Sequence, residues 1–218
     1  MEAAGWTGVY RQGRDLYTRN AVPGHRVYGE ALVTSGEAEY RQWDPWHSKL
    51  AAMFLKGRPS PLLDNVSSVL YLGGAHGTTV SHLSDALPGA TIFVIEKSPV
   101  SFAPLLALSR ERSNLIPILA DAQLPERYAA DVGPVDLLYQ DVAQRNQARI
   151  FLDNAESCLA PEGRGLLMLK VRSVTQSKPP TVVLNEARRE LSAGGFSVRQ
   201  SVELQPFARD HHALFLTR

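Results

Sequence analysis

Short, nearly continuous apolar runs recur along most of the chain and alternate with stretches of helical length. The apolar runs cover residues 66–72, 91–95, 115–119, 135–139 and 166–171. Runs of this length are typical of strands that are buried on both faces of a sheet. The stretches that predict helices are residues 78–86, 99–112, 145–159 and 180–192. Strands that alternate with helices predict an α/β fold, with a parallel sheet covered by helices on both faces.

The ends of these elements carry suitable residues. Pro99 and Pro180 fit the first turn of a helix, and Gly194-Gly195 follows the last helix as a stop. Residues 196–202 and 213–217 are two strands joined by a short loop, which predicts an antiparallel hairpin at one edge. A doubly wound, Rossmann-like sheet that ends in such a hairpin is the usual layout of class I methyltransferases, although a fold alone does not establish a function.

The first 47 residues have a different pattern. Short alternating segments rich in Tyr, Val and Thr cover residues 8–10, 16–18, 26–28 and 39–41, with a turn at Val22-Pro23-Gly24. Hairpins of this size do not hold a core alone. We therefore expect a small β-rich N-terminal domain over residues 1–47, packed on a main domain over residues 48–218.

Composition narrows the class of protein. The chain has 218 residues, of which 44% are hydrophobic and 21% are charged, as in an ordinary globular domain. It has no apolar stretch long enough for a membrane span and no signal-peptide pattern, so we expect a cytoplasmic protein without membrane association. The single cysteine, Cys158, excludes an intramolecular disulfide.

The charge balance bears on possible partners. There are 23 Lys and Arg residues against 22 Asp and Glu residues, a formal net charge of +1. A stand-alone nucleic-acid binder usually has a clear basic excess, because phosphate neutralisation supplies most of its affinity. The near neutrality indicates that any RNA contact is shared with a partner.

A glycine-rich turn follows the first apolar run of the main domain, in the order Leu72-Gly73-Gly74-Ala75-His76-Gly77-Thr78-Thr79. Such a turn brings the backbone and helix amides close to a ligand. Its spacing differs from the G-x-G-x-x-G pattern of dinucleotide-binding sites, which places a dehydrogenase last among the candidates.

Acidic residues follow the next three apolar runs. Glu96 ends the second run, Asp121-Ala122 follows the third, and Asp141-Val142-Ala143-Gln144 follows the fourth. The carboxyl ends of parallel strands meet at one edge of the sheet, where open α/β folds bind ligands. S-adenosylmethionine suits an acidic edge because it has a ribose, an amine and a positive sulfonium but no phosphate. Another Rossmann-type ligand is the alternative that this pattern leaves open.

Lys49 and Lys170 stand out because only five of the basic residues are lysines. Lys170 ends an apolar run at the ligand-binding edge. A partly desolvated lysine can lose its proton near neutral pH, which arginine cannot do. The alternative is a lysine whose amine simply reaches solvent.

Other residues carry weaker signals. His211-His212 precedes the final strand but lacks a metal-binding context, so no metal site is expected. Trp43 and Trp46 flank Asp44-Pro45, and they either stack on a base or form a hydrophobic lid between the two domains.

Several segments, spread from near the N-terminus to the C-terminal hairpin, resemble those of fibrillarins. They are residues 22–30 (VPGHRVYGE), 40–52 (YRQWDPWHSKLAA), 69–73 (VLYLG), 77–82 (GTTVSH), 114–119 (NLIPIL), 141–144 (DVAQ), 170–173 (KVRS) and 210–211 (DH). Without an arginine/glycine-rich tail the chain is similar to the archaeal type.

This resemblance implies a guide-directed RNA 2′-O-methyltransferase that uses S-adenosylmethionine. In the family the enzyme works in box C/D ribonucleoprotein particles on rRNA and tRNA, with a guide RNA, a Nop-domain scaffold protein and a kink-turn-binding ribosomal-type protein. The implied catalytic residues are Lys49, Asp141, Lys170 and His211. The implied cofactor contacts are Gly73, Ala75, Thr78, Thr79, Glu96, Lys97, Asp121, Ala122, Asp141, Val142, Ala143 and Gln144.

The chain departs from the family pattern at three places. His76 stands where serine is usual, and Lys97 replaces an aromatic residue that stacks on adenine. Two histidines stand where one is usual, and matching forward from Asp210 selects His211 rather than His212. The mechanism we expect uses Lys170 as base or hydroxyl orienter, with Asp141 positioning it and stabilising the methyl donor, and Lys49 and His211 holding the ribose and phosphate. A small-molecule methyltransferase and a non-catalytic subunit of the particle are the alternatives.

Overall fold

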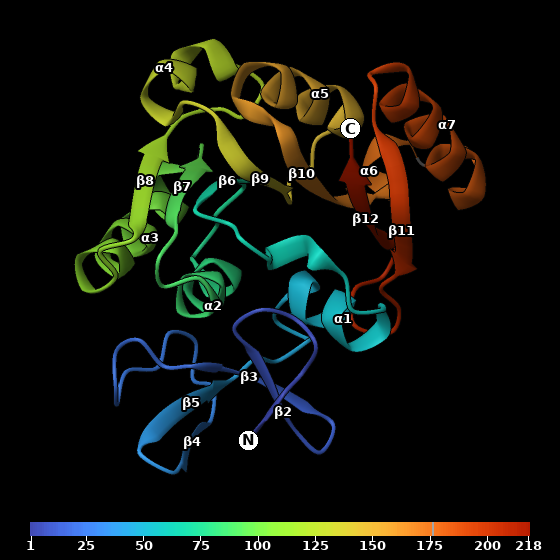
Figure 1. The fold of residues 1–218 in the computed structure, drawn as a ribbon. Coiled ribbons are helices and arrows are strands. Elements are labelled where there is room, and N and C mark those ends of the chain that lie inside the picture. Colours follow the sequence, from blue (N-terminus) through green and yellow to red (C-terminus); the bar gives the residue numbers. More distant parts are fainter. Residues whose placement is uncertain (176) are drawn as a thin grey trace.

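A computed structural model describes residues 1–175 and 177–218 and contains two β-sheets, of five and seven strands (Figure 1). The larger sheet has the strand order β11-β12-β10-β9-β6-β7-β8. Its strands are β6 (Ser68–Leu72), β7 (Thr91–Glu96), β8 (Leu115–Leu119), β9 (Val135–Gln140), β10 (Leu159–Lys170), β11 (Ser197–Glu203) and β12 (His211–Thr217). The strands from β10 to β8 run parallel, whereas β12 is antiparallel to both β10 and β11. The predicted α/β sheet with an antiparallel C-terminal hairpin is confirmed.

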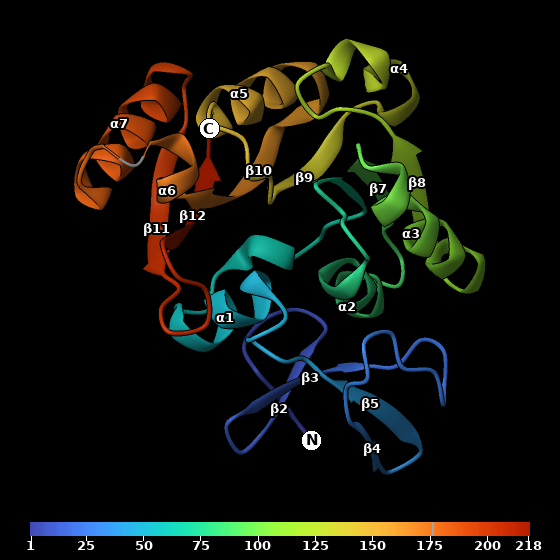
Figure 2. The same ribbon diagram turned by 180° about the vertical axis from the view of Figure 1, so that it is seen from behind.

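Helices cover both faces of this sheet, as the alternating pattern predicts (Figures 1 and 2). One face is packed by α1 (Lys49–Lys56), α2 (Thr78–Ala86) and α3 (Pro99–Glu111). The other face is packed by α4 (Ala129–Val132), α5 (Gln147–Cys158) and α7 (Pro180–Ala193). Short turns complete the chain at η1 (Pro61–Leu63), η2 (Pro125–Arg127) and α6 (Val171–Val174). Pro99 and Pro180 begin their helices, and the chain leaves α7 at Gly194.

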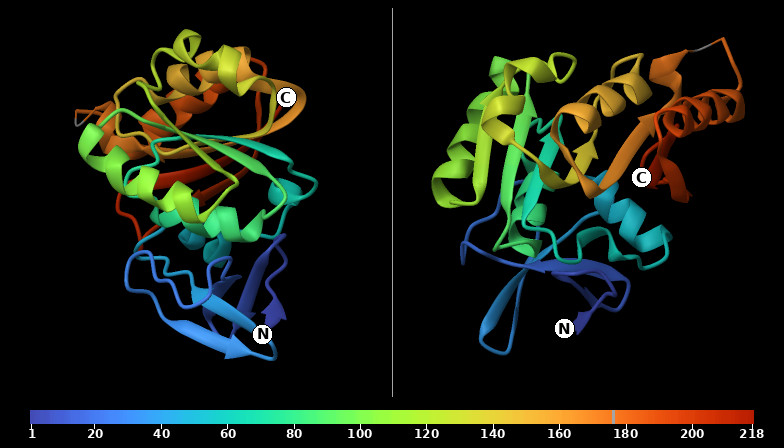
Figure 3. Two further views of the ribbon diagram at one scale, coloured as in Figure 1. Left: turned by 90° about the vertical axis from the view of Figure 1, so that its left-hand side faces the viewer. Right: turned by 45° about the horizontal axis from the view of Figure 1, so that its top comes forward.

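The N-terminal sheet lies beneath α1 and α2 (Figure 3). It is antiparallel and consists of β1 (Glu2–Ala3), β2 (Val9–Gln12), β3 (Asp15–Arg19), β4 (Leu32–Ser35) and β5 (Ala38–Gln42). Its side chains Trp6, Leu16 and Trp43 pack in the same hydrophobic cluster as α1 and α2. The sheet therefore completes the core of the main domain rather than building one of its own.

Charged side chains are also buried between the N-terminal sheet and α2. The guanidinium of Arg41 lies 2.6 Å from a carboxylate oxygen of Glu30 and 2.6 Å from one of Asp85, and Arg112 approaches Asp85 at 3.3 Å. His82 of α2 is fully buried and its ring stacks on Trp43 with centroids 4.9 Å apart. This contact fixes the sheet on α2, and with it the segment that leads into α1.

Some local expectations were wrong or incomplete, and β1, β4 and α4 were not predicted. Residues 26–28 do not form a strand, because the Glu30 carboxylate accepts the backbone N–H groups of Val27 and Tyr28 and holds a turn. The helix α1 was not predicted. Ser48 caps it by accepting the N–H of Ala51, and its buried residues lie around most of its circumference, which hides the helical period.

No helix among residues 1–175 and 177–218 is long and apolar enough to cross a membrane.

Candidate functional site

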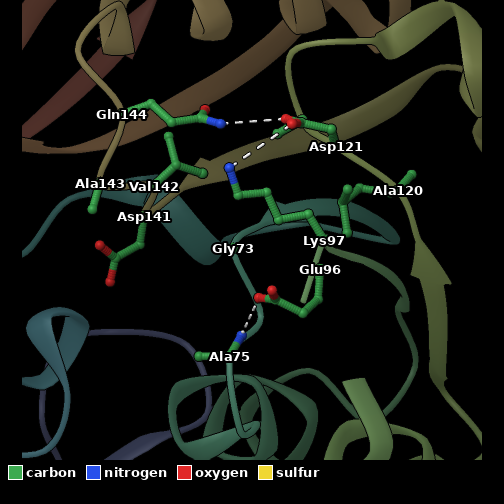
Figure 4. Close-up of a pocket in the computed structure, with 12 residues that line it drawn as sticks. Gly73, Ala75, Glu96, Lys97, Ala120, Asp121, Asp141, Val142, Ala143 and Gln144 are labelled. Carbon is green, nitrogen blue, oxygen red and sulfur yellow. Dashed lines mark hydrogen bonds and ion pairs between the residues drawn. The ribbon is translucent and has the colours of Figure 1, made fainter. Parts of the chain in front are cut away.

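A pocket of about 280 Å³ opens at the carboxyl ends of β6, β7, β8 and β9 (Figure 4). It is lined by Gly73, Ala75, Ile95, Glu96, Lys97, Ala120, Asp121, Ala122, Asp141, Val142, Ala143 and Gln144. The parallel pairing of the four strands brings these residues together, although they are distant along the chain. Most of the residues expected to contact a cofactor therefore share one cavity.

The glycine-rich turn lets β6 and β9 approach closely at the floor of the pocket. Gly73 has φ +88°, and a Cβ at this position would lie 2.3 Å from the carbonyl oxygen of Asp141. Gly77 has φ +87° and is the N-cap of α2, where a Cβ would lie 2.7 Å from the Leu108 side chain. Both residues have a left-handed φ that favours glycine, and at Gly73 the nearby backbone also leaves no room for a side chain.

Glu96 is fixed with its carboxylate toward the pocket (Figure 4). One oxygen accepts the N–H of Ala75 at 2.9 Å and the other accepts the N–H of Ser98 at 2.7 Å. The residue is 9% exposed. Since each carboxylate oxygen accepts more than one hydrogen bond, Glu96 keeps capacity for a pair of ligand hydroxyls.

Asp121 faces Glu96 across the pocket and is held by three donors. One oxygen accepts the backbone N–H of Gln123 at 3.0 Å and the amide of Gln144 at 3.3 Å, and the Lys97 amine lies 3.8 Å from the other. Burial opposes ionisation, but these donors together hold the pKa of Asp121 below its usual value. Asp121 is thus an anionic acceptor at neutral pH.

Asp141 pairs with Lys49 at the edge of the pocket. The lysine amine lies 2.7 Å from a carboxylate oxygen, across 92 residues of chain. Lys49 begins α1, so the packing of the N-terminal sheet on α2 also positions this amine. Asp141 therefore binds Lys49, whereas the expected mechanism used it to position Lys170.

Lys170 and His211 lie directly opposite each other on β10 and β12. Residues paired in this way project their side chains from the same face of the sheet. The charges of Lys49, Asp141 and Lys170 all act on the imidazole of His211. The four residues expected to be catalytic are thus gathered beside the pocket.

The imidazole of His211 is neutral at neutral pH. Burial lowers its pKa, and the two lysines lower it further against the opposing effects of the Arg209 carbonyl and Asp141. Its Nδ1 atom lies 2.7 Å from the carbonyl oxygen of Arg209, which only accepts, so Nδ1 carries the proton. The lone pair of Nε2 is left for another partner.

His212 faces the other side of the sheet. It pairs with Leu169, and the charges that act on it are those of Glu203 and Arg188. Successive residues on a strand point to opposite faces. The geometry therefore agrees with the choice of His211 rather than His212 as the site residue.

Two expected contacts, Thr78 and Thr79, lie outside the pocket lining, and so does His76. The Thr79 hydroxyl is 3.0 Å from that of Ser48 and joins α2 to α1, and the neighbouring Thr78 does not line the pocket either. His76 lines a separate recess with His25 and Glu111, away from the acidic edge. Thr79 supports the site indirectly, by joining the first turn of α2 to the residue that caps α1.

Sequence reasoning missed a buried glutamine that fixes the end of β10. The Gln147 side chain accepts the backbone N–H of Lys170 at 2.9 Å and donates to its carbonyl at 3.1 Å. Gln140 in turn donates to the backbone carbonyl of Gln147 at 2.7 Å. A polar residue in the first turn of a predicted helix gives no signal of this role.

No group of three or more His, Cys, Asp or Glu side chains suited to a metal ion occurs in the part of the chain that the structure describes.

The fold and the pocket together define a class I methyltransferase, with the parallel sheet, the C-terminal hairpin and an acidic, glycine-lined ligand site at the carboxyl edge. The Fibrillarin family model matches residues 2–218, and the chain belongs to the fibrillarin family.

Individual relatives support this assignment. The fibrillarin-like rRNA/tRNA 2′-O-methyltransferase of Methanothermobacter thermautotrophicus is 40% identical, over 100% of this chain and 97% of its own length. A fibrillarin of Aeropyrum pernix, solved with natively bound S-adenosyl-L-methionine, superposes with a TM-score of 0.86 at 41% identity, over 93% of this chain and 89% of that one. The fibrillarin of a fibrillarin/Nop5p complex superposes with a TM-score of 0.90 at 41% identity, over 100% of both chains.

Proposed function

We propose that this protein transfers a methyl group from S-adenosylmethionine to the 2′-oxygen of selected riboses in rRNA and tRNA. The observation that carries the proposal is the gathering of Lys49, Asp141, Lys170 and His211 beside an acidic pocket. Relatives of about 40–45% identity are named as enzymes of this type.

The residues of the pocket fit S-adenosylmethionine. The buried carboxylate of Glu96 suits the two ribose hydroxyls, and the anionic Asp121 suits an amine donor such as that of adenine. Asp141, on the Lys49 side of the pocket, would supply negative charge that suits a cationic sulfonium. When bound, this cofactor supplies a methyl group activated by the sulfonium.

The protein side chains have distinct tasks in the proposed reaction. A ribose hydroxyl must lose its proton as the carbon–oxygen bond forms, so the site needs an acceptor with a free lone pair. Nε2 of the neutral His211 is such an acceptor, while the Lys170 amine orients the hydroxyl oxygen. The Lys49–Asp141 pair fixes the carboxylate beside the cofactor and the start of α1.

We further propose that the protein acts in a box C/D particle, where a guide RNA selects the ribose and a Nop-domain scaffold and a kink-turn-binding protein place the substrate. The near-neutral charge of the chain supports this, because most of the RNA affinity then comes from the partners. The complex of a similar chain with Nop5p supports the scaffold part.

The test is methyl transfer from labelled cofactor to a short RNA, with and without a matching guide RNA, scaffold and kink-turn protein. Methylation at one guide-fixed ribose, in the complete mixture alone, is expected. Equal transfer without guide or scaffold would contradict the particle, and silence in every mixture would contradict the enzymatic role.

Variants of the two histidines test the proposed proton acceptor. His211→Gln is expected to slow single-turnover transfer by about 10²–10⁴-fold, the usual contribution of a general base. His212→Gln is the matched control on the opposite face of β12 and is expected to keep full activity. Lys170→Arg keeps donors for the hydroxyl oxygen and is expected to retain activity, whereas a loss as large as that of His211→Gln would make Lys170 the proton acceptor instead.

A further inference from the structure

Trp46 is the most exposed tryptophan and lies beside the proposed reaction site. The residue is 61% exposed, while Trp6 and Trp43 are almost fully buried. The nearby core is already filled by Trp43, which packs edge-on against Phe54 with ring centroids 5.5 Å apart. Trp46 is therefore not required for the core, and a large apolar ring left in water is typical of a binding surface.

The exposed ring of Trp46 is held in one orientation. Phe207 packs against it in a T-shaped arrangement with ring centroids 5.0 Å apart, and Phe207 is itself anchored on the hydrophobic core. The backbone N–H of Trp46 donates to Asp44 at 2.9 Å, and the other oxygen of that carboxylate pairs with His47 at 2.7 Å. A ring fixed in advance binds a flat ligand at little cost in entropy.

Both aromatic residues belong to segments that carry proposed reaction residues. Trp46 precedes Lys49 by three residues, a span of at most about 11 Å. Phe207 lies four residues before His211, in the loop between β11 and β12. This loop and α1 lie side by side in Figures 1 and 2, and the Lys56 amine donates to the Gln205 carbonyl between them. The aromatic pair therefore flanks the place proposed for the target ribose.

We propose that Trp46, supported by Phe207, stacks on a nucleobase of the substrate RNA that adjoins the target nucleotide. This inference rests on the proposed function and adds a positioning residue to it. Stacking suits guide-selected substrates because every base has a flat π face, so the contact tolerates any sequence.

The surroundings of the pair favour a nucleobase over a protein partner. Charged and polar residues adjoin the two rings along the chain: Asp44 and His47 flank Trp46, and the exposed Arg209 follows Phe207 by two residues. The centre of a protein interface is depleted of charged residues, whereas a base with its phosphates needs a small apolar platform in polar surroundings.

Photocrosslinking in the assembled particle tests the contact without requiring methyl transfer. Substrate RNAs carry 5-iodouridine on the 5′ or the 3′ side of the target nucleotide. We expect one of the two to crosslink to the tryptic peptide of residues 42–49, in which Trp46 is the exposed tryptophan. The crosslink should disappear in Trp46→Leu. Crosslinks to the scaffold or to other peptides alone would overturn the proposal and make the platform a protein contact.

A coupling experiment distinguishes stacking from a merely structural role. Trp46→Ala is expected to weaken substrate binding in the particle by roughly 5- to 150-fold on intact RNA. On RNA with an abasic site at the crosslinking position the same substitution should have almost no effect. An equal loss on both RNAs, or no loss on either, would overturn the inference.

Three further variants serve as controls. Trp46→Phe keeps a π face and should restore most of the binding, whereas Trp46→Leu should not. Tyr10 and Tyr40 form a similar T-shaped pair at 5.0 Å on the N-terminal sheet, so Tyr10→Ala removes a comparable ring away from the site and should leave RNA binding unchanged. If the wild type methylates RNA in a guide-dependent way but shows neither the crosslink nor the coupling, only the stacking proposal is contradicted. The crosslink without any methylation would contradict the proposed function alone.

Discussion

At the scale of single residues, the carboxylates of the pocket are oriented by hydrogen bonds that exist before a ligand binds. Glu96 accepts hydrogen bonds from two backbone N–H groups, and Asp121 accepts one from a backbone N–H and one from the side-chain amide of Gln144. These bonds orient the carboxylates in advance, so a ligand does not have to order them. We therefore expect ligand affinity to fall when Glu96 or Asp121 is replaced.

We predict that Glu96→Ala weakens cofactor binding by about 1–3 kcal/mol, because the ribose hydroxyls lose their acceptor. Isothermal titration calorimetry with S-adenosylmethionine measures the change. Asp136→Ala is the matched control. Its carboxylate also accepts backbone N–H groups, from Ser67 and Ser68, but at the opposite end of the strands. Affinity that falls equally in both variants, or in neither, would place the ribose elsewhere.

Lys97 leads to the opposite prediction. Its side chain is 57% exposed and its contact with Asp121 is long, at 3.8 Å. Such a pair contributes about 0–1 kcal/mol, whereas an aromatic ring stacked on a base contributes about 1–3 kcal/mol. Lys97→Phe is therefore expected to tighten cofactor binding about tenfold by calorimetry. Lys97→Leu removes the charge without adding a ring, and equal affinities of the two variants would argue against adenine at this position.

At the scale of elements, the contact of the N-terminal sheet with α2 is made by buried charges. Arg41 is fully buried and joins Glu30, Ser81 and Asp85. Because α1 follows directly from this sheet, the network also determines where Lys49 lies. Loss of the network should therefore affect stability and the site together.

We predict that Arg41→Met lowers the free energy of unfolding by about 3–5 kcal/mol, because it leaves the buried Glu30 without a cationic partner and Asp85 with Arg112 alone. Urea denaturation gives the value. Arg149→Met is the control, since Arg149 pairs with Asp153 on the exposed face of α5 at 2.7 Å and such pairs contribute less than about 1 kcal/mol. Similar losses in both variants would contradict a dominant role for the buried network.

The same interface predicts a pH dependence through His82. Burial lowers its pKa well below the usual value of 6.5, and Arg41 and Arg112 lower it further. The unfolded chain therefore binds a proton near pH 6.5 that the folded protein does not bind, and stability falls as the pH drops from 7 toward 5. Urea unfolding across this range is expected to show a flatter dependence for His82→Gln. A slope in His82→Gln equal to that of the wild type would contradict this role of the buried imidazole.

The sequence predicted the strands that are formed by continuous apolar runs. It missed features that depend on contacts between residues distant in the chain. The runs that became β6, β7 and β9 are mostly apolar, so their identity as central strands followed from local pattern alone. The run that became β8 is equally apolar, but β8 lies at the edge of the sheet and leaves Ile116 and Leu119 exposed, so its expected burial on both faces was wrong. The helix α1 has almost no polar face, which hides its helical period. The turn before Glu30 depends on hydrogen bonds from the backbone N–H groups of Val27 and Tyr28 to the Glu30 carboxylate. The pairing of Lys49 with Asp141 and the support of Lys170 by Gln147 join residues that only the tertiary fold brings together.

At the scale of the whole molecule, the formal charge of +1 conceals a local basic recess next to the reaction site. Arg145, Lys170 and Arg172 line a recess of about 810 Å³, in which Asp210 pairs with Arg172 at 3.2 Å. Three cationic side chains can orient an RNA strand that is already bound, but they contribute too little affinity to bind it from solution. The free protein should therefore bind RNA weakly and depend on its partners for affinity.

The three cations predict how strongly salt weakens RNA binding by the isolated protein. Each phosphate contact to a single strand lowers the logarithm of the binding constant by about 0.7 per tenfold increase in salt, so three contacts predict a slope of about −2. Fluorescence anisotropy of a labelled single-stranded RNA at several salt concentrations measures it. Arg145→Gln and Arg172→Gln should each reduce the slope by about 0.7 and weaken all sequences alike. Arg11→Gln, on the N-terminal sheet, should change neither. A much steeper slope in the free protein would mean that it carries an RNA-binding surface of its own, and that the partners select the ribose without supplying the affinity.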